Sequence, residues 1–589
     1  MALVKEKVET IQGSDLLIRC LAEQGVDTMF ILTGGAVLPV TDAIGRLNEK
    51  YGIKYIVTKK EDGAGFAASG YARSSGKVGV VVTTSGPGAT NMITPLDNAR
   101  GDSIPMLFIS GQVASYSIGK DAFQEAPVTE ITRPITKRSY LVKNINDLPH
   151  KLHEAFYIST HGRQGPVHID FPKDIQQTRT SLENRIYSSP RFDFDSELDD
   201  DTINLVIGQI QKSKSPILYV GGGVISSNAS EELKKLSELT NIPVTTTLMG
   251  LGAFPGTHKN CLGMLGMHGT AYSNFAICGS PLNNYKDGAD LVLAIGVRFD
   301  DRVTGNPKEF AKNAYIVHVD IDERENGKIK VPDLFVFSDV KKFLQKLNSG
   351  VIREQMPDYS TWWEHINTLR QKFPLKYEDW KDEVDREIPT QYVIQTLCRL
   401  TKNQDPIVST GVGQHQMWAA QYFLVDKPRK FLTSGGKGAM GFGFPAAIGA
   451  QVANPESLVI DLDGEESFKM AQYELETVAR YNLPVKIVIF DNMGHGMVQQ
   501  WQIANYDGRI VASKFEPIVD LSKIAAAYET SEGRRLIGSK RISKNDEVEP
   551  ALREMLNFPG PYVLQVDVRY EDCLPMIPAG KSVREIQLT

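Results

Sequence analysis

Acidic and amide side chains follow two neighbouring apolar runs in the C-terminal third of the chain. The run VIDL at 459–462 leads into the acidic sequence DGEE at 463–466, and the run PVKIVIF at 484–490 leads into the pair DN at 491–492. Short apolar runs of this kind are typical of buried strands. Because parallel strands of one βαβ unit end at the same edge of a sheet, we expect these polar groups to lie close together. Hard oxygen ligands with room for water suit Mg²⁺ that holds a diphosphate.

A helix is expected between these two strands. The intervening segment carries apolar residues at Met470, Leu475, Val478 and Ala479, which predicts a helix with a face turned toward the sheet. A strand, a helix and a second strand in this order form one βαβ unit, which is the arrangement that brings the two polar strand ends together.

The same alternation recurs in the N-terminal part of the chain. A strand-like run at 28–32 leads into Gly34-Gly35, a run at 54–58 precedes a small-residue helix at 63–72, and a run at 78–84 precedes the loop SGPGATN. Strands that alternate with helices predict a parallel, doubly wound sheet. The loops that follow its strands should carry the ligand contacts.

A second α/β unit begins with the run at 216–220, which leads directly into the sequence GGGVISS. Further runs lie at 243–248, 291–295 and 316–321, and the last of them ends in VDID. Glycines after one strand and an acid after a later one are similar to a dinucleotide site. GGGVISS is not GxGxxG, however, so a tight structural turn is an equally good interpretation.

Length and composition indicate a large multidomain protein. With 589 residues the chain is too long for one core, and about three or four domains are expected. The net charge of -6 gives no reason to expect nucleic acid or an anionic membrane as partner. The five cysteines form no CxxC pair, so neither a disulfide framework nor a zinc site is indicated. No stretch has the pattern of a secretory signal or a membrane span, so the cytoplasm is the expected location unless a targeting peptide has been cleaved.

Two polar stretches without clear periodicity, at about 181–201 and 355–389, are interpreted as linkers. They divide the chain into domains at 1–185, 200–350 and 385–589. The predicted fold class is therefore α/β, with three doubly wound parallel-sheet domains.

Long sequence blocks identify a family. The chain resembles the thiamin-diphosphate enzymes of the acetolactate (acetohydroxyacid) synthase type along essentially its whole length. The resemblance rests on eleven collinear blocks: FILTGGAVLPV, EDGAGFAASGYAR, TSGPGATN, IGKDAFQE, GPVHIDFPKDIQ, GMLGMHGTAYSN, GVRFDDRVTG, VGQHQMWAAQ, SGGKGAMGFGFPAAIGA, GMVQQWQ and LPMIPAG. It implies a pyrimidine-binding domain, a central FAD-binding domain and a pyrophosphate-binding domain, with the cofactor clamped at a dimer interface.

The resemblance implies a cofactor site. Thiamin diphosphate reacts through a carbanion at C2 of its thiazolium ring, and a carboxylate at pyrimidine N1′ raises the basicity of the aminopyrimidine. Glu61 in EDGAGFAASGYAR matches that carboxylate, although an isolated Glu here would be interpreted as a helix N-terminal residue that favours the dipole. The other residues implied around the cofactor are Pro87, Val412, Gly413, Gln414, His415, Gly438, Met440, Glu466, Ser467 and Met497. Those implied as Mg²⁺ ligands are Glu465, the Asn492 side chain and the Gly494 carbonyl.

The resemblance also implies a reaction: a 2-oxo acid, most simply pyruvate, is decarboxylated and its two-carbon fragment is joined to a second 2-oxo acid. The residues that match the substrate pocket, besides Glu61, are Phe123, Gln124, Lys173, Arg302 and Trp501. Arg302 would bind the acceptor carboxylate with its planar guanidinium, and Trp501 would form a wall beside it. Taken alone, Arg302 would be interpreted as half of a surface ion pair.

FAD and partner chains complete the implied picture. The FAD of this family is largely structural, and the matching residues are Arg163, Gly222, Gly223, Met267, His268, Arg298, Asp320 and Asp339. The resemblance implies a homodimer or homotetramer with the active site at the dimer interface, with a regulatory subunit as a further partner. Nucleic acid and membranes are not expected as partners.

Departures from the family pattern leave the substrate open. Glu465 stands where the family has Asp, and its extra methylene shifts an ion that prefers strict octahedral geometry. Lys437 replaces a Leu, and we expect it to pair with a substrate anion or with an acid such as Glu466. The segment 278–288 is interpreted as an inserted surface loop. The alternatives are a specialised thiamin-diphosphate decarboxylase, lyase or carboligase for another substrate, and a non-catalytic cofactor-binding paralogue.

Overall fold

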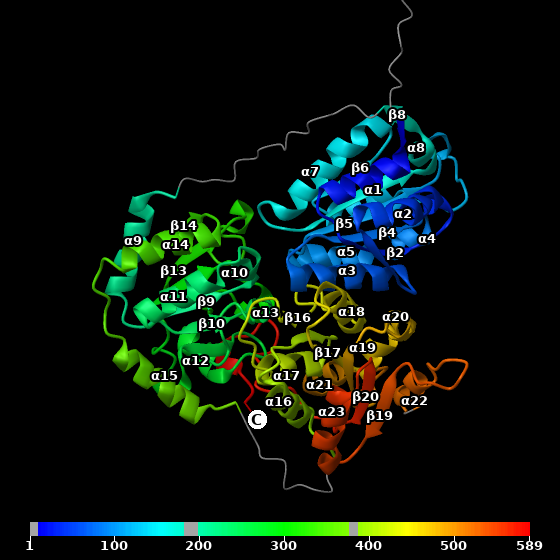
Figure 1. Ribbon diagram of the computed structural model, residues 1–589. Helices are drawn as coiled ribbons and strands as arrows, with labels where there is room; N and C mark the ends of the chain where they lie inside the picture. Colours follow the sequence, from blue (N-terminus) through cyan, green and yellow to red (C-terminus); the bar gives the residue numbers. More distant parts are fainter. Residues whose placement is uncertain (1–9, 182–197, 376–386, 517, 589) are drawn as a thin grey trace, which may run out of the picture.

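The computed structural model describes residues 10–181, 198–375, 387–516 and 518–588. Within these residues it contains three six-stranded sheets in which every pairing between neighbouring strands is parallel, each covered by helices (Figure 1). The predicted α/β class with three doubly wound domains is confirmed. The domain limits 1–185, 200–350 and 385–589 remain a prediction.

The N-terminal domain is built on a sheet with the strand order β3-β2-β4-β5-β7-β6. The strands are β2 (Thr28–Leu32), β3 (Lys54–Val57), β4 (Gly79–Thr83), β5 (Met106–Gln112), β6 (Arg138–Leu141) and β7 (Pro166–Pro172), and an antiparallel pair joins β1 (Thr10–Gln12) to β8 (Arg179–Ser181). The helices are α1 (Gly13–Glu23), α2 (Leu38–Tyr51), α3 (Glu61–Ser75), α4 (Pro87–Thr90), α5 (Ile93–Asp102), α6 (Val128–Thr132), α7 (Leu148–Thr160) and α8 (Lys173–Gln177).

The central domain has the strand order β11-β10-β9-β12-β13-β14. The strands are β9 (Pro216–Val220), β10 (Val244–Thr246), β11 (Cys261–Met264), β12 (Leu291–Ile295), β13 (Tyr315–Asp320) and β14 (Leu334–Phe337). The helices are α9 (Asp200–Lys212), α10 (Gly222–Ser226), α11 (Ser230–Thr240), α12 (Ala271–Cys278), α13 (Asp301–Thr304), α14 (Val340–Val351) and α15 (Ser360–Lys372).

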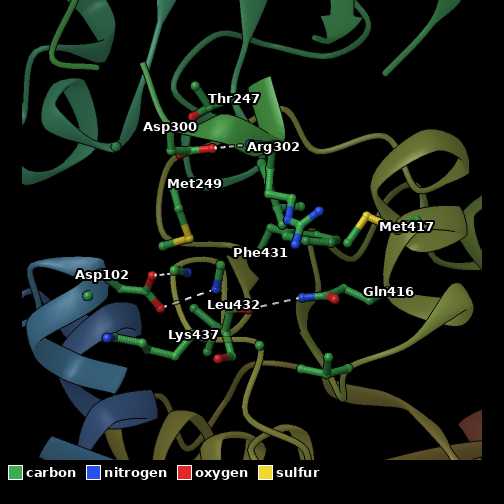
Figure 2. A pocket seen from close by; sticks show the side chains of 18 of the residues that line it. Asp102, Thr247, Met249, Asp300, Arg302, Gln416, Met417, Phe431, Leu432 and Lys437 are labelled. Carbon is green, nitrogen blue, oxygen red and sulfur yellow. Dashed lines mark hydrogen bonds between the residues drawn. The ribbon is translucent and has the colours of Figure 1, made fainter. Parts of the chain in front are cut away.

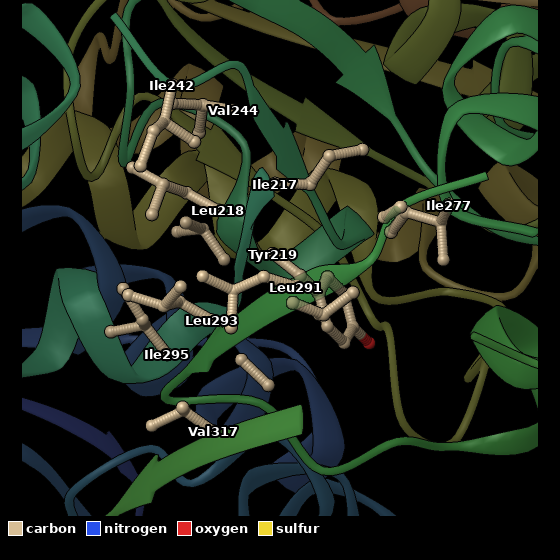
Figure 3. Close-up of a cluster of buried hydrophobic side chains, with 14 of the residues drawn as sticks. Ile217, Leu218, Tyr219, Ile242, Val244, Ile277, Leu291, Leu293, Ile295 and Val317 are labelled. Carbon is tan, nitrogen blue, oxygen red and sulfur yellow. The ribbon is translucent and has the colours of Figure 1, made fainter. Parts of the chain in front are cut away.

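The core of the central domain explains why its strands are continuous apolar runs. Leu218 of β9 pairs with Leu293 of β12, and both side chains are fully buried, as are Ile295 and Val317 beside them (Figure 3). Strands covered by helices on both faces bury every side chain, so their sequences do not alternate. This is why the runs at 216–220 and 291–295 could be located from the sequence.

The second predicted linker is partly wrong. Helix α15 occupies Ser360–Lys372, inside the stretch 355–389 that was interpreted as a linker. Trp362, Ile366 and Leu369 are buried against the central core, and the Trp362 indole N–H donates to the carbonyl of Pro216 at 3.1 Å. Trp362 therefore anchors a helix of the central domain within the predicted linker. The other predicted linker, at 181–201, lies mostly outside the described residues.

The C-terminal domain has the strand order β16-β15-β17-β18-β20-β19. The strands are β15 (Ile407–Thr410), β16 (Phe431–Leu432), β17 (Val459–Gly464), β18 (Lys486–Asp491), β19 (Gly538–Ile542) and β20 (Tyr562–Asp567). The helices are α16 (Thr390–Thr401), α17 (Gln414–Tyr422), α18 (Gly443–Ala453), α19 (Glu465–Lys469), α20 (Leu475–Tyr481), α21 (Gly496–Asn505), α22 (Leu521–Ala526) and α23 (Val548–Asn557).

The connection between β17 and β18 differs from the single helix that was expected. Helix α19 ends at Lys469, a 3₁₀ turn follows at Gln472–Glu474, and α20 completes the connection. The N–H groups of Met470 and Ala471 bond three residues back rather than four, which tightens the chain and shifts the helical face. As a result Met470 is 49% exposed, whereas Leu475 is buried as predicted.

Helices α3 and α18 join the N-terminal domain to the C-terminal domain by packing against each other without intervening side chains (Figure 1). A Cβ atom at Gly449 would lie 1.7 Å from the carbonyl oxygen of Ala67, and one at Gly70 would lie 2.0 Å from that of Ala446. One hydrophobic core therefore runs through both domains.

The C-terminal tail returns to the central domain. The N–H of Ile577 donates to the carbonyl of Met267 at 2.8 Å, and the carbonyl of Lys581 accepts from the N–H of Asn306 at 2.9 Å. All three domains are thus joined around one region. Among the described residues, no helix combines the length and apolar character needed to cross a bilayer.

We predict that Gly449→Ala lowers the midpoint of thermal unfolding and reduces the free energy of unfolding by about 1–3 kcal/mol. The reason is that the new methyl group meets a backbone carbonyl, which no side-chain rotation can move. Gly45→Ala is the matched control: Gly45 lies within α2 with no atom within 4 Å of an added Cβ. At this position alanine should raise the free energy of unfolding by roughly 0.5–1 kcal/mol. Scanning calorimetry of both variants checks this, and equal midpoints for Gly449→Ala and the wild type would contradict the packing argument.

Candidate active site

A cavity of about 820 Å³ lies where the three domains meet. Its lining comes from the end of α5 and the loop before β7 in the N-terminal domain, from the strand ends of the central domain, and from the loops after β15, β16, β17 and β18 in the C-terminal domain. Figure 2 shows that side chains of all three domains point into this space. The predicted position of a ligand site, at the carboxyl ends of parallel strands, agrees with this location.

Oxygen atoms from β17 and β18 converge at one corner of the cavity. Glu465, the first residue of α19, is 3% exposed and accepts a hydrogen bond of 2.6 Å from the N–H of Gly494. The side-chain oxygen of Asn492 is buried and has no hydrogen-bond partner among the described residues. The expectation that the two polar strand ends lie close together is therefore confirmed.

This corner fits a hard divalent cation. It offers a carboxylate, an amide oxygen without a partner and the Gly494 carbonyl. Asp491, in contrast, is engaged: it accepts from the N–H of Met493 at 3.1 Å and from the Gln565 amide at 2.8 Å. The described residues contain no group of three or more His, Cys, Asp and Glu side chains that could hold a metal, so amide and carbonyl oxygens, water and a diphosphate would have to complete the coordination of Mg²⁺.

The protonation of Glu465 responds to its burial. Removal from water, and secondarily the neighbouring carboxylate of Asp491, raise the pKa of Glu465 to about 8. A cation at this corner would favour the charged form and reverse the shift. Binding of a metal at this corner would therefore be coupled to release of the Glu465 proton.

Glycine-rich segments form the floor beside this corner. Gly413, with φ near 157°, turns the chain into α17, and the side chains of Gln414 and His415 line the cavity. Burial lowers the pKa of His415 to about 3, so the imidazole is neutral. Gly438 adopts a φ of 62°, which opens the loop after β16 toward the same space. Backbone N–H groups presented in this way suit phosphate oxygens.

The N-terminal domain holds the loop at 434–438 in place. The carboxylate of Asp102, at the end of α5, accepts from the N–H of Gly436 at 2.6 Å and from that of Gly435 at 3.2 Å (Figure 2). Arg73 donates to the same carboxylate at 2.7 Å, and both side chains are almost completely buried. The sequence analysis assigned no role to Asp102 or to Arg73, the last residue of the block EDGAGFAASGYAR, because the loop that they hold belongs to another domain.

Lys437 has a different partner from the expected one. Its ammonium lies 3.0 Å from the carboxylate of Asp97, whereas Glu466 pairs with Lys469. Gly101 gives the lysine stem room, since a Cβ there would lie 3.2 Å from it. The positive charge is therefore directed at α5.

The central domain forms the opposite wall. Gly222 and Gly223 follow β9, and Gly223 packs so closely on Gly296 that a Cβ would lie 2.6 Å from its Cα, so these glycines are needed for packing as well as for lining the cavity. The other FAD candidates on the lining are Arg163, Met267, His268, Arg298 and Asp320. Asp339 is not on the lining. It caps α14 by accepting from the N–H of Lys342 at 3.1 Å.

The electrostatics of this wall are mixed. Arg163 donates to Glu325 at 2.6 Å, and Arg298 donates to the carbonyl of Gly101 at 2.6 Å. Burial raises the pKa of Asp320 to about 6 and lowers the pKa of His268 to about 4. The δ nitrogen of His268 is buried without a hydrogen-bond partner among the described residues.

The substrate candidates divide into two groups. Arg302, Trp501 and Met497 line the cavity, and the Arg302 side chain is 58% exposed with a weak contact of 3.6 Å to the sulfur of Met267. Of the cofactor and metal candidates in the C-terminal domain, Val412, Met440 and Ser467 also line it. All the residues of this first group therefore line the same cavity within a single chain.

The second group lies on the N-terminal domain and does not line this cavity: Glu61, Pro87, Phe123, Gln124 and Lys173. Glu61 begins α3 and accepts from the Asn91 amide at 2.8 Å. Gln124, with φ of 60°, lies against Gly86, where a Cβ would be 2.9 Å from the Gln124 carbonyl oxygen. Phe123 is 89% exposed. Within one chain the two groups therefore do not form a single site.

Comparison with known proteins agrees with this geometry. The description of the thiamine pyrophosphate enzyme N-terminal TPP binding domain matches residues 11–131, that of the central domain matches 203–347, and that of the C-terminal TPP binding domain matches 411–566. Acetolactate synthase 3, chloroplastic, from Brassica napus is 44% identical over 586 residues, which cover 98% of this chain and 87% of the relative. The chain belongs to the acetolactate synthase family of thiamine pyrophosphate enzymes.

Other members of the family are equally similar. Acetolactate synthase, chloroplastic, from Arabidopsis thaliana is 43% identical over 594 residues, 98% of this chain and 84% of the relative. Acetolactate synthase 1, chloroplastic, from Zea mays is 44% identical over 589 residues, 98% and 89% of the two chains. The names of these relatives place them in the chloroplast, which contradicts the cytoplasmic location expected for this chain. That expectation was wrong because the lack of an apolar segment is common to proteins of both compartments.

For this member of the family we predict that binding of Mg²⁺ and thiamin diphosphate strengthens as pH rises. Below the pKa of about 8 a proton must leave Glu465 before the cation binds, so the affinity should rise by about tenfold per pH unit toward pH 8 and then level off. Titration calorimetry at several pH values measures this. Glu465→Gln should lose the slope, whereas the control Glu456→Gln, an exposed residue before β17 that does not line the cavity, should keep it. A wild-type affinity independent of pH would contradict the assignment of Glu465.

Proposed function

We propose that this protein is an acetolactate-synthase-like carboligase that decarboxylates a 2-oxo acid, most simply pyruvate, and joins the two-carbon fragment to a second 2-oxo acid. The observation that carries the proposal is the corner of Glu465, Asn492 and Gly494 beside the glycine-rich floor of the cavity. It provides oxygen ligands for Mg²⁺ and backbone N–H groups for a diphosphate in one place. The names of the relatives support the reaction class.

The residues of the chain divide the work. When bound, thiamin diphosphate supplies a stabilised carbon nucleophile. Glu465, Asn492 and Gly494 would hold the metal, and the backbone N–H groups of 413–415 and 437–438 would face the diphosphate. The Glu61 carboxyl, which accepts a hydrogen bond from the Asn91 amide, would exchange a proton with the aminopyrimidine of the cofactor. Arg302 binds the carboxylate of the acceptor, and Trp501 limits the size of its side chain.

FAD fits the central-domain wall of the cavity. Gly222 and Gly223 allow close approach, and Arg163, His268 and Arg298 offer donors beside Asp320. The carboligation needs no electron transfer, so this cofactor has a structural role in the proposed function.

A second copy of the chain completes the proposed site. Glu61, Gln124 and Phe123 are required in the chemistry but lie outside the cavity of their own chain. We propose a homodimer in which these residues of one copy face the metal corner of the other, so that each site draws on both chains. A large exposed side chain such as Phe123 is then covered.

The departures that favoured another substrate carry less weight in the folded chain. Lys437 is neutralised by Asp97 and does not face the substrate residues of the cavity with a free charge. The segment 278–288 is folded on itself, with Asp287 accepting from the N–H of Ser280 at 2.6 Å, and is absent from the cavity lining. These positions give no reason to prefer a different 2-oxo acid or a non-catalytic paralogue.

We predict that the purified protein with Mg²⁺, thiamin diphosphate and FAD releases CO₂ from pyruvate and forms acetolactate, identified by product mass. Glu61→Gln should lower the rate by about 10²–10⁴-fold, because the amide does not take the proton. Glu49→Gln, exposed on α2, serves as the control and should leave the rate unchanged.

Screening other 2-oxo acids tests the alternatives. CO₂ release from a different acid without acetolactate from pyruvate would favour the specialised enzyme. Cofactor binding in calorimetry without any turnover would favour the non-catalytic paralogue, and full activity of Glu61→Gln would refute the proposed mechanism.

A further inference from the structure

The loop that precedes Glu61 is held by the C-terminal domain of the same chain. We infer that Glu474 is a positioning residue for Glu61: its carboxylate fixes the backbone of the β3–α3 loop and thereby sets where the Glu61 carboxyl lies. The inference rests on the proposed function, because it assumes that Glu61 acts on the cofactor.

The contact consists of main-chain hydrogen bonds between domains. The N–H of Lys59 donates to Glu474 at 3.0 Å, and the N–H of Lys60 donates to the same oxygen at 3.3 Å. Thr477 donates its hydroxyl to the other oxygen at 2.5 Å. Glu474 has no exposed surface and forms no ion pair among the described residues. A buried carboxylate is costly, and here it is stabilised chiefly by the loop that leads to Glu61.

The start of α3 depends on this contact. Lys60 is the N-cap residue, and its side chain makes no cap hydrogen bond. Gly63 lies in the first turn, and a Cβ there would be 2.1 Å from the Glu474 carboxylate oxygen. The helix that carries Glu61 therefore begins directly against Glu474, with no side chain between them.

Neighbouring contacts come from the same segment of the C-terminal domain. The Tyr481 hydroxyl accepts from the N–H of Val57 at 3.0 Å, and the Tyr473 hydroxyl donates to Asp62 at 2.9 Å. Residues on both sides of Glu61 are thus bound by residues 473–481. This segment continues from α19, which begins with Glu465, so one stretch of chain links the metal corner to the Glu61 loop.

A role limited to holding the domains together does not explain these contacts. Helices α3 and α18 already join the two domains through their close packing. Glu474 instead contacts the backbone of Lys59 and Lys60, immediately before Glu61. Burial raises the pKa of Glu474 to about 7, against the lowering effect of the Thr477 hydroxyl and of the two N–H groups.

The test measures deuterium exchange at C2 of thiamin diphosphate bound to the full-length protein with Mg²⁺, since this exchange reports directly on activation by Glu61. We expect Glu474→Ala to slow the exchange by about 100-fold, because a shift of about 1 Å in a catalytic group costs that much. The dissociation constant of the cofactor should change by less than about threefold, since Glu474 lies away from the metal corner. Glu474→Gln has the same shape and keeps one acceptor, so it should slow exchange by about tenfold.

The matched control is Glu476→Gln. Glu476 is two residues along the chain, and its carboxylate pairs with the Lys59 side chain at 2.5 Å while it is 41% exposed. It touches the same loop residue without holding the backbone, so exchange should stay at the wild-type rate. The inference would be overturned if Glu474→Gln and folded Glu474→Ala exchanged at the same rate as Glu476→Gln. If Glu474→Ala does not fold, Glu474→Gln alone decides.

Glu61→Gln separates this inference from the proposed function. If Glu61→Gln leaves exchange at C2 unchanged, the proposed mechanism itself is wrong. If Glu61→Gln slows exchange and the Glu474 variants do not, only the positioning role of Glu474 is wrong.

Discussion

The architecture depends on the close approach of helices α3 and α18. Glycines at Gly70 and Gly449 let the two backbones touch, so the sheets of the N-terminal and C-terminal domains are held at a fixed distance. Helix α3 starts at Glu61, and α18 follows directly after the glycine-rich loop at 434–441. One pair of helices therefore fixes Glu61 relative to the glycine-rich loop of the same chain, which in the proposed dimer belong to two different sites, and a change at their crossing would affect both sites.

Close to this crossing, buried carboxylates of each domain accept hydrogen bonds from a loop of the other domain. Asp102 and Arg73 of the N-terminal domain stabilise the loop at 434–438, while Glu474 of the C-terminal domain stabilises the loop before Glu61. Each domain thus holds a loop of the other. Such reciprocal contacts restrict the motion of both loops. Binding groups that are already held in place lose less conformational entropy when a ligand binds.

The sequence predicted the sheets well because buried parallel strands are continuous apolar runs, as at 216–220 and 291–295. It predicted the helix between β17 and β18 poorly, because the turn at Met470 depends on local hydrogen bonding rather than on apolar spacing. The roles of Asp102 and Glu474 could not be predicted, since their partners are distant in sequence. Asp339 illustrates the opposite case: an acid expected at the FAD wall is a helix N-cap, a common function of Asp.

The lysines that precede Glu61 and the departing Lys437 are each paired with an acid within the fold. Lys59 pairs with Glu476, Lys60 with Asp62, and Lys437 with Asp97. Exposed or half-exposed pairs of this kind contribute little stability. Glu465 is different, because it is buried and its pKa is raised to about 8. The proposed Mg²⁺ would offset the cost of burying this carboxylate, so the metal corner is the position where divergence from the family would alter the chemistry.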